Sequence, residues 1–161
     1  LLATLSNHYA VNFNKPDLYN FCPNPLEFVL HEKVPELVLN NHKLRFDLLS
    51  DIEQTEISDR KQSRLYNGIQ SSGNLFQRNE KSFQLLSLAL KKMIQKYYEM
   101  HQTSPCAFIK LFPKDIQFSS SWYVRMKQGG HLNSHIHEDG WISGAVYLSI
   151  PKAAAKACIR R

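Results

Sequence analysis

The stretch His135-Ile-His137-Glu-Asp139-Gly-Trp-Ile142 runs directly into an apolar, β-prone segment, Ser143-Gly-Ala-Val-Tyr147-Leu-Ser-Ile-Pro151. In an extended strand, side chains at positions i and i+2 point to the same face. This spacing predicts that His135, His137 and Asp139 share one side of a strand, as the proximal half of a mononuclear metal site. A His-x-His pair alone suits zinc, copper, nickel or iron equally, and such pairs are also common on strands that bind no metal.

The residues before Pro105 carry the helical signals. An asparagine, a proline and a glutamate at 24–27 are typical of a helix start, and leucines predict further helical pieces to about residue 52. The charged stretch 51–64 is predicted to be a solvated face or a loop, and the polar stretch 67–74 is predicted to be a loop. The strongest helix is predicted over about 79–101, where apolar residues recur at helical spacing. These residues are Phe83, Leu86, Leu90, Ile94 and Tyr97.

The residues after Pro105 carry β signals instead. A short strand is predicted over 107–112, a clearer alternating strand over 118–126, and a turn at Gly129-Gly130. The histidine stretch and the 141–150 segment supply two more predicted strands, and Gly144 within the second one indicates a close approach of backbone or of a ligand. Helices followed by at least four antiparallel strands predict an α+β fold.

Composition narrows the classes of function. The 161 residues are 43% hydrophobic, which allows one domain with a real core. The net charge of +6 falls to +2 for residues 1–150, because four basic residues and no acidic residue lie in 151–161. We therefore expect no nucleic-acid partner, and no apolar run is long enough to predict a membrane span. The scattered Cys22, Cys106 and Cys158 favour a reducing, cytoplasmic location over a disulfide framework.

Five motifs in the last third of the chain carry a resemblance when they are taken together. They are Trp122-Tyr-Val-Arg-Met126, Gly129-Gly-His131, Asn133-Ser-His-Ile-His-Glu138, Gly140-Trp-Ile-Ser-Gly144 and Tyr147-Leu-Ser-Ile-Pro151. This string resembles the 2-oxoglutarate/Fe(II)-dependent oxygenases, and within them the branch often found behind tetratricopeptide repeats. The specific part covers about residues 118–151, and Gln70-Ser-Ser-Gly-Asn-Leu-Phe76 upstream is also similar to that branch.

The resemblance implies a double-stranded β-helix, a jelly-roll-like antiparallel barrel that holds Fe(II) and takes 2-oxoglutarate as cosubstrate. The family's proximal ligands lie on a His-x-Asp/Glu motif. The alignment that best places the following strand puts His135 and His137 on these two positions, and we prefer it. The competing alignment uses His137 and Asp139. Tyr147 falls where related enzymes bind the distal carboxylate of 2-oxoglutarate, although a core aromatic residue is an equal alternative there.

The resemblance also implies a distal histidine and, about ten residues later, an Arg or Lys that pairs with 2-oxoglutarate. No histidine follows His137 in this sequence, and the basic, alanine-rich 152–161 segment resembles no oxygenase strand. The expectation is therefore a fragment that lacks the distal half of the barrel. Its predicted parts are a mainly helical region over 1–103 that packs on the sheet, the proximal part of the barrel over 104–151, and an atypical tail over 152–161.

Three functions remain open at this point. The first is a hydroxylase-type dioxygenase that is incomplete and inactive as this chain, with an unknown small-molecule or protein substrate. The second is a non-catalytic binding or structural remnant of the same fold. The third is an unrelated zinc- or copper-binding module that uses the histidines. In the first two cases an incomplete barrel would leave open sheet edges, which predict self-association.

Overall fold

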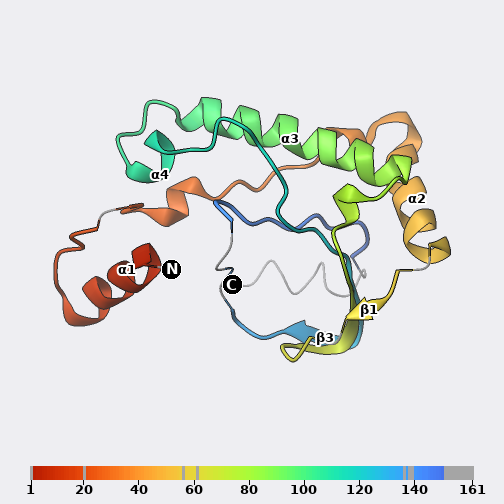
Figure 1. Cartoon of the computed structure of the whole chain (residues 1–161), viewed down its shortest axis with the longest axis horizontal. Helices are drawn as coiled ribbons and strands as arrows, with labels where there is room; N and C mark the ends of the chain where they lie inside the picture. Colours follow the sequence, from red (N-terminus) through yellow and green to blue (C-terminus); the bar gives the residue numbers. More distant parts are fainter. Residues whose placement is uncertain are drawn as a thin grey trace.

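The computed structural model describes residues 2–19, 21–55, 57–60, 62–135, 137 and 140–150. The chain begins with helix α1 (Leu2–Phe13), two short 3-10 helices, η1 (Pro25–Phe28) and η2 (Pro35–Leu37), and helix α2 (Leu39–Gln54). Strands β1 (Asp59–Arg60) and β2 (Leu65–Ser71) precede η3 (Leu75–Gln77) and the long helix α3 (Lys81–His101). A short helix, α4 (Ala107–Lys110), and strand β3 (Val124–Leu132) complete the described elements (Figure 1).

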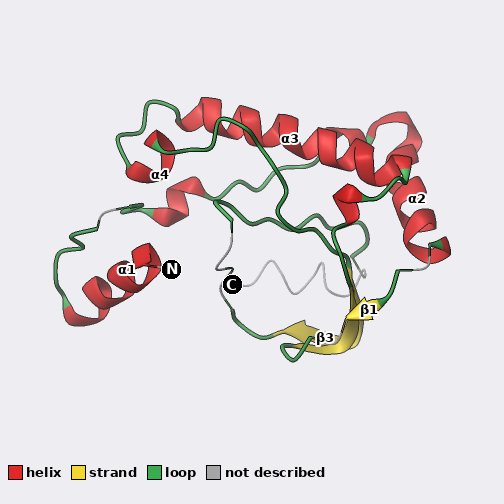
Figure 2. Ribbon diagram, viewed as in Figure 1, coloured by secondary structure: helices red, strands yellow, loops and turns green. Residues whose placement is uncertain are grey.

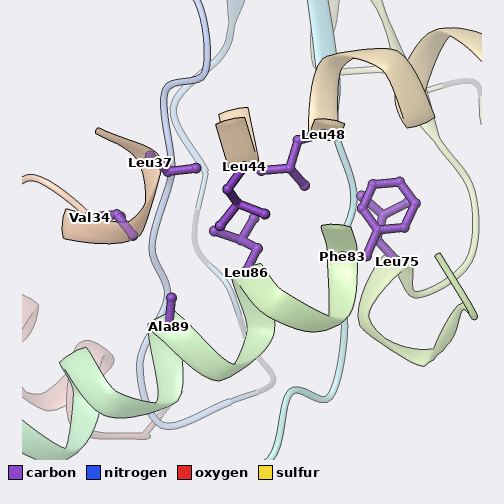
Figure 3. Close-up of a cluster of buried hydrophobic side chains, with 8 residues drawn as sticks. All are labelled: Val34, Leu37, Leu44, Leu48, Leu75, Phe83, Leu86 and Ala89. Atoms are coloured by element: carbon purple, nitrogen blue, oxygen red, sulfur yellow. The ribbon is translucent and has the colours of Figure 1, made fainter. Parts of the chain in front are cut away.

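The helices pack where their apolar faces meet. The leucines of α2 and the apolar face of α3 point toward each other in the main core (Figure 3). The α3 face is the one that the helical spacing predicts, and Phe83 and Leu48 are each only 1% exposed. The buried members of this main core are Val34, Leu37, Leu44, Leu48, Leu75, Phe83, Leu86 and Ala89.

A second, aromatic cluster lies at the other end of α3. Tyr97, Cys106, Phe108 and Ile109 are its buried members, and Phe21, Cys22, Phe28, Tyr98 and Phe112 pack against them. Phe108 and Ile109 are consecutive and both buried, which suits one turn of helix rather than an alternating strand. The strand predicted over 107–112 is therefore wrong, and helix α4 takes its place.

One antiparallel sheet, in the order β1-β2-β3, lies on the opposite side of the molecule from α3 (Figure 1). Strand β2 occupies most of the stretch predicted as a loop over 67–74, because its backbone finds a full partner in β3. Gly68 suits this pairing, since a Cβ there would lie 3.1 Å from the carbonyl oxygen of Arg125. The predicted turn at Gly129-Gly130 is instead an irregularity inside β3, where Tyr66 pairs with His131 and Gly68 with Met126.

The described residues between Asn133 and Ile150 contain no strand, so the two strands predicted there are wrong (Figure 2). A strand needs a neighbouring backbone to satisfy its N–H and C=O groups, and this segment packs through side chains instead. Val146 and Leu148 lie against the main core, and the Leu148 carbonyl oxygen accepts a hydrogen bond from Arg45 Nε of α2. The four α-helices and three antiparallel strands of the described residues confirm the α+β class.

Candidate metal centre

The two candidate ligands lie on the loop that follows β3. This loop is anchored at its start, where the Asn133 N–H donates to the carbonyl oxygen of Arg64 over 2.9 Å. It is anchored again beyond the histidines, where the Trp141 Nε1–H donates to the carbonyl oxygen of Phe108 over 3.1 Å. The Trp141 ring also stacks on Phe108 with 6.1 Å between ring centroids. The loop thus bridges the sheet and the aromatic cluster.

The structure brings the rings of His135 and His137 together, although neither residue is in a strand. Their centroids are 4.9 Å apart, the rings are tilted by 57°, and both side chains are exposed. Imidazole nitrogens bind divalent ions at about 2.1 Å, so two rings on adjacent coordination positions have centres roughly 5 Å apart. The separation of the two imidazoles therefore fits a shared metal ion.

The hydrogen bond of His135 defines which ring nitrogen can bind a metal. Its Nδ1 lies 2.7 Å from the carbonyl oxygen of Asn133, and a carbonyl oxygen can only accept, so Nδ1 carries the proton. In the neutral ring, Nε2 is then the nitrogen that can bind a metal. Metal-binding histidines commonly hold their second nitrogen on a backbone carbonyl in this way, which fixes the tautomer and the ring orientation.

The other two candidate site residues are Asp139 and Tyr147. Asp139 lies outside the described residues, and the pair His137 and Asp139 stays a prediction. Tyr147 is 75% exposed, and the aromatic contacts of the described residues include none between it and either histidine. Within the described part of the chain, no group of three His, Cys, Asp or Glu side chains could hold a metal ion.

Trp141 packs in the aromatic cluster through Phe108 and Phe21. A Cβ at Gly144 would meet no described heavy atom within 4 Å, so a close backbone approach at this glycine is wrong, and the alternative, a ligand approach, stays a prediction. The glycine instead belongs to an exposed part of the loop segment.

Sequence reasoning missed the support that the upstream motif gives to this region. Ser71, at the end of β2, donates its N–H to the Tyr123 carbonyl oxygen over 3.1 Å, and its Oγ accepts from the Tyr123 N–H over 3.0 Å. The N–H groups of Leu75 and Phe76 bond to the O and Oγ atoms of Ser121 at 3.0 and 2.9 Å. The 70–76 motif thus holds residues 121–123 in place, although the two stretches lie about fifty residues apart.

None of the described helices is both long enough and apolar enough to cross a membrane. Comparison with curated proteins and with solved structures finds no match for this chain. Comparison with protein families finds a match to a model described as "Putative 2OG-Fe(II) oxygenase", which covers residues 120–161. The matched segment begins just before Trp122 and contains both histidines. Residues 120–161 are thereby identified as a match to the 2OG-Fe(II) oxygenase family, which confirms the resemblance carried by the sequence motifs.

Proposed function

We propose that His135 and His137 are the proximal protein ligands of an Fe(II) site in a hydroxylase-type, 2-oxoglutarate-dependent dioxygenase. One observation carries the proposal: two exposed imidazoles lie 4.9 Å apart, and one of them has its Nδ1 held on a backbone carbonyl. The family match over the same residues supports iron over other metals that two imidazoles would also bind.

When bound, Fe(II) and 2-oxoglutarate would supply an O2-activating centre that oxidises a substrate while 2-oxoglutarate is converted to succinate. The residues of this chain would bind and orient the metal ion and 2-oxoglutarate. His135 would bind the metal through its unprotonated Nε2 atom, and His137 would be the adjacent ligand. The Tyr147 hydroxyl is the proposed contact for the distal carboxylate of 2-oxoglutarate, and its 75% exposure leaves it accessible to a ligand.

We further propose that the three-stranded sheet is the start of a double-stranded β-helix. Among the described strands β3 pairs only with β2, so the backbone groups of its other edge are open to a further strand. A strand from the same protein or from a second copy could add there, which is also the proposed route to self-association. The free thiols of Cys22 and Cys106 support the proposed cytoplasmic location.

A second candidate function is a zinc- or copper-binding module without oxygenase activity. The observation that favours it is that the described residues bring together two ligands rather than three. Two exposed histidines suit zinc and copper as well as iron. The two candidates differ in their response to 2-oxoglutarate, because only an oxygenase site binds the cosubstrate beside the metal.

Thermal unfolding with added metal tests both candidates. Anaerobic Fe(II) and Mn(II) should raise the melting temperature of the wild type, and 2-oxoglutarate should raise it further. His135→Ala and His137→Ala should abolish both shifts, whereas the control His131→Ala should keep them, since His131 stacks on Tyr66 instead. Equal shifts of the melting temperature in the wild type and in the two ligand variants would show that these histidines do not bind the metal. A zinc shift without any effect of 2-oxoglutarate would favour the second candidate.

We expect the 161-residue polypeptide, assayed alone, to form no measurable succinate. The described residues bring together two imidazoles, which are fewer protein ligands than the family's site implies, and 2-oxoglutarate would lack the basic partner that pairs with its carboxylate in that family. Succinate formation by this polypeptide that His135→Ala abolishes would contradict this expectation.

A further inference from the structure

We propose that Trp122 is a positioning residue that holds the imidazole of His137 in the orientation in which it binds the metal. This inference rests on the proposed function, because it assigns a role toward the same metal ligand. The two rings stack, with 6.0 Å between their centroids and an interplanar angle of 21°. This geometry lies within the range of favourable offset stacking between aromatic rings.

The two histidines are restrained in different ways. His135 has its Nδ1 on the Asn133 carbonyl oxygen, whereas no described residue forms a hydrogen bond with the His137 ring. The ring–ring contacts of His137 with described residues are the stack on Trp122 and the tilted contact with His135. An exposed histidine without restraint would populate several rotamers, and this freedom would be lost on metal binding. Trp122 reduces that loss by holding one ring orientation.

Trp122 can do this because its own backbone is fixed on both sides. The preceding Ser121 is held by the N–H groups of Leu75 and Phe76, and the following Tyr123 is held by two hydrogen bonds to Ser71. Ser71 itself is only 1% exposed, so this support is part of the folded interior. A site is more precise when the groups that support its ligands are themselves locked by packing and hydrogen bonds.

The first test uses the protein without metal. The ring-proton NMR shifts of His137 should change in Trp122→Ala and in Trp122→Leu, since both variants remove the indole ring current. The leucine variant retains apolar bulk and serves if the alanine variant does not fold. Tyr66→Leu is the matched control, because Tyr66 stacks on His131 with a centroid distance of 4.8 Å and should move only the His131 signals. Unchanged His137 shifts in the Trp122 variants would overturn the inference.

The second test measures Mn(II) binding by electron paramagnetic resonance of the free ion. Loss of outer partners of a metal ligand weakens metal affinity by about 10–100-fold, and we expect about 10-fold for Trp122→Ala. Trp122→Phe, which keeps an aromatic face, should restore most of this affinity, and Tyr66→Leu should match the wild type. Equal affinity in the wild type and Trp122→Ala would overturn the inference and leave the proposed function intact. Absence of Mn(II) binding by the wild type would overturn the proposed function, and the NMR shifts alone would then decide whether Trp122 orients His137.

Discussion

The Nδ1 atom of His135 donates a hydrogen bond of 2.7 Å to the carbonyl oxygen of Asn133, two residues before it in the chain. The N–H of the same Asn133 donates to the carbonyl oxygen of Arg64, which is the residue just before β2. The orientation of one imidazole is thus linked through a single backbone residue to the sheet. A backbone carbonyl cannot be removed by a side-chain mutation, so this restraint persists in most variants of the loop.

The first prediction concerns the tautomer of His135. At a pH where the ring is neutral, the nitrogen NMR shifts should show a protonated Nδ1 and a bare Nε2, because only a protonated Nδ1 can bond to a carbonyl oxygen. Addition of diamagnetic Zn(II) should then change mainly the Nε2 signal. A neutral ring that carries its proton on Nε2 would contradict the hydrogen bond and would make Nδ1 the free donor.

The second prediction tests the main core. Phe83→Ala should lower the free energy of unfolding by about 3–5 kcal/mol, because it removes a fully buried ring and leaves a cavity between α2 and α3. Leu88→Ala on the same helix is the matched control, since Leu88 is 56% exposed. This variant should lower the free energy of unfolding by less than about 1 kcal/mol. Urea unfolding followed by circular dichroism measures both. Similar losses in the two variants would mean that α3 does not bury this face.

The third prediction tests the irregularity in β3. A Cβ at Gly130 would lie 2.8 Å from the Asn67 carbonyl oxygen and 2.9 Å from that of Lys127. Both atoms belong to the backbone and cannot rotate away, so Gly130→Ala should destabilise the protein by about 1–3 kcal/mol. Gly144→Ala is the control, because a Cβ there meets no described atom within 4 Å. Equal stability of the two variants in urea unfolding would show that the strand pairing differs from the one described.

The fourth prediction concerns alkaline pH. Burial, and after it the nearby Cys22 and Cys106 thiols, raise the pKa of Tyr97 to about 12, and its hydroxyl donates to the Phe28 carbonyl oxygen over 2.9 Å. The unfolded chain loses this proton near the ordinary tyrosine pKa of about 10. Between these two values the unfolded state binds fewer protons than the folded state, so the free energy of unfolding should fall as the pH rises.

Tyr97→Phe removes the titrating group and tests this expectation. The stability of the wild type should fall more steeply than that of the variant from about pH 10 upward, measured by urea unfolding in steps of pH. Near pH 8 Tyr97 is neutral in both the folded and the unfolded chain. The free energies of unfolding of the two proteins should therefore differ only by the lost hydrogen bond, which is worth about 1 kcal/mol. Parallel alkaline curves would show that Tyr97 ionises equally easily in the folded and unfolded chain.

The sequence predicted those parts of the fold that depend on local periodicity. Helix α3 and its apolar face follow from residues three and four apart, and they were predicted correctly. Strand β2 was missed because its polar sequence forms a strand only through pairing with β3, more than fifty residues later. The closeness of His135 and His137 was predicted from their spacing, but the expected reason, a shared strand face, was wrong. The two rings lie instead on a loop that is anchored at Asn133 and Trp141 by tertiary hydrogen bonds, which no local pattern predicts.

The fifth prediction separates the two ligand alignments. If His135 and His137 are the proximal pair, His135→Ala should abolish Mn(II) binding, while Asp139→Asn should weaken it by less than about 10-fold, as expected for a group beside the ligands. The alternative pair, His137 and Asp139, predicts the reverse order. His137→Ala should abolish binding in both cases and therefore serves as the common reference.

The ring separation of 4.9 Å and the fixed Nδ1 of His135 favour the first result. Manganese titrations of the three variants, each confirmed as folded by circular dichroism, decide between the two alignments. Loss of binding in Asp139→Asn with binding retained in His135→Ala would assign the carboxylate as the second ligand.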